Sequence, residues 1–121
     1  MFLIAAGGAL GALFRYWVQQ LTHTIIGREF PYGTLFANVV GSFLMGFLYV
    51  YLVERVGVSV ELRLALLVGL LGAFTTFSTF SMETISLAEQ GHLLKAGLNV
   101  IASVGLCLLG CWMGLVLGRQ I

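Results

Sequence analysis

The sequence is poor in charge: Lys and Arg number 6, and Asp and Glu number 5, among 121 residues. Only 9% of the chain is therefore charged, whereas a soluble domain carries roughly 25% charged residues. The missing charge leaves uninterrupted apolar stretches at 30–53, 64–82 and 96–118. A helix of about 20 such residues crosses the ~30 Å hydrocarbon layer of a bilayer. We therefore expect an integral membrane protein, and a net charge of +1 implies no nucleic-acid partner.

Proline and cysteine are also scarce. Pro31 is the single proline, and the two cysteines, Cys107 and Cys111, lie four residues apart in the last apolar stretch. On a helix that spacing places the two thiols one turn apart, where they do not form a disulfide with each other. We therefore interpret both cysteines as small residues that pack between helices. Glycine is abundant, with 16 residues, and pairs such as Gly110 and Gly114 predict closely packed membrane helices.

We expect a single transmembrane domain over 1–121, built as an all-α bundle of four helices. The expected spans are about 2–21, 33–53, 60–88 and 94–117. Ser59 is the expected N-cap of the third helix, with Glu61 in its first turn.

The basic residues are balanced between the two expected membrane faces, whereas an excess on one face normally fixes orientation. One face carries Arg55, Arg63 and Arg119, and the other carries Arg28 and Lys95, with Arg15 added if it reaches that end. Such a chain can insert both ways, so that two opposed copies pair. A single orientation set by other signals is the alternative.

Polar residues inside the apolar spans are candidate functional residues, because they are costly in lipid unless paired. Asn38 and Ser42 share one face of the second span, and Asn99, Ser103 and Cys107 share one face of the fourth. The densest cluster is Thr75-Thr76-Phe77-Ser78-Thr79-Phe80-Ser81 in the third span. Two interpretations stay open: hydroxyls that bond back within a continuous helix, or a break near 73–78 that frees carbonyls for an ion.

The middle of the first, second and fourth spans lacks a carboxylate, which disfavours proton-coupled export of cations. The available groups are hydroxyl and amide donors and two phenyl rings, whose edges are electropositive. This combination suits a small hydrated anion that must be held weakly enough to leave. On spacing alone, Phe77 and Phe80, three residues apart, are better explained by helix packing.

Three sequence strings resemble the Fluc (CrcB) family of fluoride channels. They are GGALGALFRY at 7–16, GTLFANVVGSF at 33–43 and GAFTTFSTFSME at 72–83, and the last is the most specific. The resemblance implies an antiparallel, dual-topology homodimer with two pores. It also implies a break in the third helix, where the backbone carbonyls of Gly72 and Thr75 from both subunits hold a structural sodium ion.

The resemblance further implies which side chains serve the pore. Paired phenylalanines, an asparagine, a hydroxyl track, a vestibule arginine and an acid near the exit are the expected parts. By position these are Phe77, Phe80, Asn38, Ser78, Thr79, Ser81, Ser103, Arg15 and Glu83. Whether Asn99 and Cys107 also line the pore stays open.

The implied activity is passive export of fluoride across a bacterial inner membrane, with no enzymatic reaction. The main alternative is a small proton-coupled multidrug-type exporter, which has four short helices and dual topology as well. That class requires a glutamate in the first span, where this chain has Arg15. A subunit of a larger complex that transports nothing alone is a third possibility.

Overall fold

The computed structural model describes residues 1–27, 30–56 and 58–120. Arg28, which enters the count of basic residues, lies outside this part of the chain, as does the side chain of Arg55. All regular elements of the described residues are helical.

Four helical passes follow one another along the chain. The first is α1 (Phe2–Ile25), and the second is α2 (Tyr32–Tyr49) continued by a π-helical end, η1 (Val50–Val56). The third consists of α3 (Val60–Leu64), π-helical η2 (Ala65–Leu71), α4 (Gly72–Phe74) and α5 (Phe77–Glu89). The fourth is α6 (Leu93–Gln120). Each pass ends slightly beyond the expected span, and Ser59 caps α3 as predicted by accepting a hydrogen bond from the Leu62 N–H at 3.3 Å.

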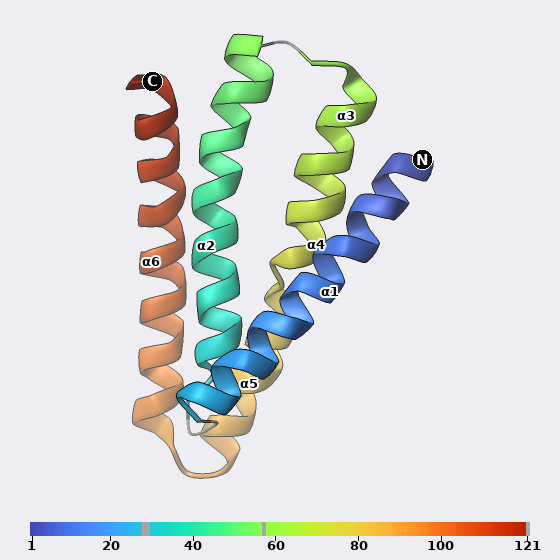
Figure 1. Ribbon diagram of the computed structural model, residues 1–121. Helices are drawn as coiled ribbons and strands as arrows, with labels where there is room; N and C mark the ends of the chain where they lie inside the picture. The colour runs from blue at the N-terminus through green and yellow to red at the C-terminus, as the bar shows by residue number, and fades with distance from the viewer. Residues whose placement is uncertain (28–29, 57, 121) are drawn as a thin grey trace.

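The passes alternate in direction (Figure 1). Both termini lie toward one end of the bundle, in the upper part of the view, together with the C-terminal end of η1 and the N-terminal end of α3. The C-terminal end of α1, the start of α2 and the turn between α5 and α6 lie at the opposite end. Helix α1 crosses the others obliquely, whereas α2 and α6 run nearly side by side.

Glycines allow the helix backbones to meet. A Cβ at Gly114 of α6 would collide with the Phe43 carbonyl of α2, and one at Gly46 would collide with the Cys111 carbonyl. Gly11 of α1 lies in the same way against the backbone of Leu70 in η2. Helices in lipid gain no hydrophobic free energy from each other, so such close backbone contact is what holds them together.

The outer surface is apolar, as a lipid environment requires. On α6 alone, Leu94, Ile101 and Leu108 are 77%, 72% and 68% exposed. Within the described part of the chain, three segments are long and apolar enough to cross a membrane: Tyr32–Glu54, Val60–Glu89 and Leu93–Gln120. Helix α1 is 24 residues long, but its second half carries polar side chains such as Gln19 and His23. The chain is thus an all-α membrane protein, with three membrane-crossing segments identified in this way.

Candidate functional site

The third pass is interrupted between α4 and α5. Thr75 and Thr76 are extended, with φ/ψ of −89°/155° and −153°/128°. The Thr76 hydroxyl then caps α5 by accepting from the Thr79 N–H at 3.4 Å. Of the two interpretations of the hydroxyl cluster, the helix break is therefore the one the structure has. Back-bonding also occurs beside it, since the Thr75 hydroxyl donates to the Leu71 carbonyl at 3.1 Å.

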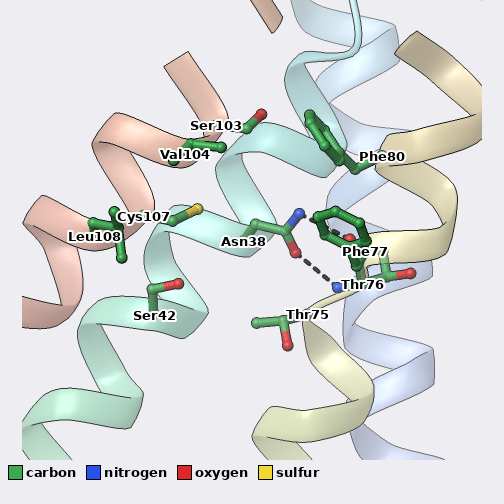
Figure 2. Close-up of a pocket in the computed structure, with 10 residues that line it drawn as sticks. All are labelled: Asn38, Ser42, Thr75, Thr76, Phe77, Phe80, Ser103, Val104, Cys107 and Leu108. Atoms are coloured by element: carbon green, nitrogen blue, oxygen red, sulfur yellow. Dashed lines mark hydrogen bonds between the residues drawn. The ribbon is translucent and has the colours of Figure 1, made fainter. Parts of the chain in front are cut away.

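Asn38 of α2 bridges this break. Its Nδ2 donates to the Thr76 carbonyl at 3.0 Å, and its Oδ1 accepts from the Thr76 N–H at 2.7 Å (Figure 2). The side-chain amide thereby takes the place of a neighbouring peptide group. Backbone groups exposed by a break in a membrane helix need such partners, because lipid offers none.

The same hydrogen bonds affect the two carbonyls expected to hold sodium. In an uninterrupted helix the Gly72 carbonyl would accept from Thr76 N–H, and the Thr75 carbonyl from Thr79 N–H. Here Thr76 N–H donates to Asn38, and Thr79 N–H donates to the Thr76 hydroxyl. Both carbonyl oxygens therefore lose their helical donors, and Gly72 is exposed on the chain surface. Such oxygens are suitable ligands for a hard cation.

A groove of ≈ 340 Å³ opens beside the break, between α2, α5 and α6 (Figure 2). Ten residues line it, and none of these ten is charged. They are Asn38, Ser42, Thr75, Thr76, Phe77, Phe80, Ser103, Val104, Cys107 and Leu108. The lining thus consists of hydroxyls, one amide, one thiol, two phenyl rings and aliphatic groups.

The two phenyl rings differ in their surroundings. Their centroids lie 5.3 Å apart with planes at 50°, so that they form a tilted pair. Phe80 is buried, at 7% exposure, whereas Phe77 is 73% exposed although it also lines the groove.

Four of the nine side chains predicted for the pore line this groove: Asn38, Phe77, Phe80 and Ser103. Three predicted track hydroxyls are not among the lining residues. Ser78 and Thr79 hydrogen-bond with the Thr76 hydroxyl at 3.3 and 3.4 Å, and Ser81 donates to the Phe77 carbonyl at 3.0 Å. The hydroxyls of these three residues thus form hydrogen bonds within the first turns of α5.

Sequence reasoning left Ser42, Thr76 and Cys107 out of the predicted pore set, although all three line the groove. A signal for two of them was present. Ser42 follows Asn38 by four residues, and Cys107 follows Ser103 by four, so each pair shares a helix face.

Glu83 belongs to a second cavity, of ≈ 400 Å³, where His23, His92 and Lys95 also lie. Its Oε2 accepts from the Thr34 hydroxyl at 3.1 Å, and that hydroxyl accepts from Gln19 Nε2 at 3.0 Å. This chain of bonds links α5, α2 and α1.

Arg15 follows Gly11 by one turn on α1 and is partly buried. It is not among the described residues that line either cavity. The vestibule role expected for Arg15 stays a prediction.

Together these features define a class: a helical membrane protein with an uncharged polar groove at a broken helix. Irregular backbone at such depth is tolerated where it lines a cavity, and transport proteins place ions at such breaks.

Comparison with known proteins gives the family. Residues 2–115 match the family described as CrcB-like protein, Camphor Resistance (CrcB). A fluoride-specific ion channel FluC from Methylococcus capsulatus is 58% identical over 121 residues, covering 100% of this chain and 53% of that protein. Proteins of the same name from Coxiella burnetii and Geobacter sulfurreducens are 46% and 48% identical, over 98% and 95% of their own lengths. The chain thus spans about half of the first relative and nearly all of the other two, and it belongs to the CrcB family.

Proposed function

We propose that this chain is a fluoride-selective channel that lets fluoride leave the cell passively. The observation that carries the proposal is the groove beside the break, lined by hydrogen-bond donors and two phenyl rings and by no charged side chain. Membership of a family whose relatives are named fluoride-specific ion channels supports it. A multidrug-type exporter finds no support in those relatives.

The chemistry of the groove suits this ion. Fluoride is small and strongly hydrated, so hydroxyl and amide donors must replace the water that it sheds. The edges of Phe77 and Phe80 offer the positive part of the ring quadrupole. Full positive charges would hold the anion too firmly, whereas conduction requires weak sites.

The driving force is electrical, and no reaction is catalysed. Hydrogen fluoride crosses membranes as a neutral acid and dissociates inside, which traps the anion. A negative interior potential then drives fluoride outward with ~2.3 kcal/mol per charge per 100 mV.

The proposed assembly is an antiparallel homodimer with two pores, in which α1 is the fourth membrane span. The groove is open on one side within a single chain, because Phe77, which lines it, is 73% exposed. Gly72 is exposed at the same break. The balance of basic residues supports insertion in both orientations, and the bacterial relatives support an inner-membrane location.

A structural sodium ion at the joint between the copies fits the break. The carbonyls of Gly72 and Thr75 lose their helical donors to Asn38 and Thr76, so they need another partner. Two such carbonyls from each copy would form an oxygen site for a hard cation.

The deciding experiment is fluoride efflux from liposomes that contain only the purified chain and are loaded with potassium fluoride. We expect efflux when a potassium ionophore releases the opposing voltage, and retention of chloride in matched vesicles. Efflux that requires a proton gradient would favour an exporter, and absence of efflux from correctly inserted protein would overturn the channel.

The sodium and dimer proposals use the same vesicles. Replacement of sodium by N-methylglucamine throughout purification should lower fluoride efflux and release monomers on size-exclusion chromatography. Unchanged efflux and unchanged elution would refute the sodium site without touching the channel proposal.

A further inference from the structure

Asn99 lies outside the groove and is almost completely buried, at 1% exposure. Its amide Nδ2 donates to the Thr84 hydroxyl at 2.8 Å, and that hydroxyl donates to the Phe80 carbonyl at 2.8 Å. The Ser103 hydroxyl lies 3.4 Å from Asn99 Oδ1. Asn99 therefore joins two residues of the groove, Phe80 through its backbone and Ser103 through its side chain.

These bonds fix the direction of every proton in the network. Thr84 has one hydroxyl proton, which it donates in a hydrogen bond to the Phe80 carbonyl, because a carbonyl can only accept. The Thr84 oxygen must then accept from Asn99, which places the amide nitrogen on that side. Asn99 Oδ1 consequently faces Ser103, and Ser103 has to be the donor.

Ser103 differs in this respect from other hydroxyls of the chain. Thr22, Thr75, Ser81 and Thr84 each donate to the carbonyl one turn earlier, at 2.7–3.1 Å. Ser103 instead donates to a side chain, at 3.4 Å. An O–H···O bond is strongest near 2.7–2.8 Å, so the Ser103 bond is weak and easily given up.

We infer that Asn99 is a positioning residue for anion passage, acting through Ser103. It keeps the Ser103 hydroxyl away from the preceding carbonyl and accepts its proton when the groove holds no anion. An arriving anion replaces Asn99 as the acceptor of the Ser103 hydrogen bond, because hydrogen bonds to ionised acceptors are about twice as strong as neutral ones. The hydroxyl returns to Asn99 when the anion leaves. This inference rests on the proposed fluoride conduction.

A double-mutant cycle tests it, with fluoride efflux as the readout and elution of the dimer as the check on folding. Asn99→Leu keeps the branched shape of the side chain and removes the acceptor, so that Ser103 bonds to the backbone instead. We expect about a tenfold loss of efflux, equivalent to one hydrogen bond. Ser103→Ala should cost about the same, and the double variant should lose no more than Ser103→Ala alone.

If Asn99 were only a packing residue, Asn99→Leu would lower efflux by the same factor in the wild-type chain and in the Ser103→Ala background. Additive losses, or full efflux from Asn99→Leu, would overturn the inference. In either case efflux from the wild-type chain would still support the channel, whereas its absence would count against the channel itself.

Should Asn99→Leu prevent folding, Thr84→Val replaces it, since valine matches threonine in shape and removes the hydroxyl that anchors the amide. The expected loss of efflux is about twofold to fivefold, and it should vanish in the Ser103→Ala background. Thr24→Val, at an exposed back-bonded hydroxyl of α1, is the matched control and should leave efflux unchanged.

Discussion

Helix α2 contacts α6 along one side and the break between α4 and α5 along another, and the two contacts differ in their chemistry. Toward α6, Gly46 and Gly114 bring backbone against backbone, with Phe43 and Cys111 carbonyls at the closest points. Toward the break, Asn38 instead supplies two hydrogen bonds to the backbone of Thr76. The first contact depends on the absence of side chains, and the second depends on one side chain.

This difference separates stability from conduction. A glycine contact gains dispersion energy along its whole length and tolerates no added atom. A bridged break gains little, but it exposes carbonyls and sets where α5 begins. Substitutions at the glycine contact should therefore prevent folding, and substitutions at the bridged break should lower fluoride efflux.

The largest effect is expected at the glycine contact. Gly114→Leu would press a side chain into the Phe43 carbonyl, which costs more than about 3 kcal/mol of stability. We expect almost no folded protein on size-exclusion chromatography. Gly105→Leu on the same helix is the control, because no atom lies within 4 Å of its Cβ position, and folding there should persist. Equal yields from the two variants would contradict the role assigned to the close contact.

The next effect is expected in the groove. Phe80→Ile removes the ring edge but keeps an apolar side chain at a buried position. Fluoride efflux should fall at least about a hundredfold while the variant elutes from size-exclusion chromatography like the wild type. Phe36→Ile, at a 55% exposed ring of α2, should conduct like the wild type. Normal efflux from Phe80→Ile would leave the ring-edge account without support.

A smaller effect is expected at the bridge over the break. Asn38→Leu removes two hydrogen bonds from the half-buried backbone of Thr76, each worth about 0.5–1.5 kcal/mol. Efflux should fall about tenfold or more, with a modest loss of thermal stability. Ser42→Ala, one turn away in the same groove, should have the weaker effect on efflux because no bond to the break is lost. The reverse order would show that the bridge contributes less to conduction than a groove hydroxyl does.

Much of the fold could be predicted from the sequence. Charge-free stretches indicated the helical passes, and Ser59 was a correct N-cap. The position of the break followed from the family resemblance of the 72–83 string, since the residues alone slightly favoured a continuous helix.

The site could be predicted only in part. Ser78 and Ser81 looked like pore hydroxyls because they sit in the most specific motif, yet their hydroxyls bond within the first turns of α5. Two extended residues reset the helical phase at the break, so helix faces cannot be extrapolated from α4 into α5, and the pore roles of Ser78 and Ser81 stay predictions. Asn99 could not be interpreted at all without knowing that Thr84 lies opposite it.

The sequence by itself determined that this protein lies in a lipid bilayer and to which family it belongs. A chain with 9% charged residues and long apolar stretches has to satisfy its backbone with helices in lipid, and its family follows from local strings. Only the tertiary structure decided which polar groups are available to an ion. Spacing tells which residues share a helix face, but not whether a hydroxyl donates to the carbonyl one turn earlier, as Ser81 does, or to a side chain, as Ser103 does to Asn99. That distinction depends on which helices meet, and so on contacts far apart in the chain.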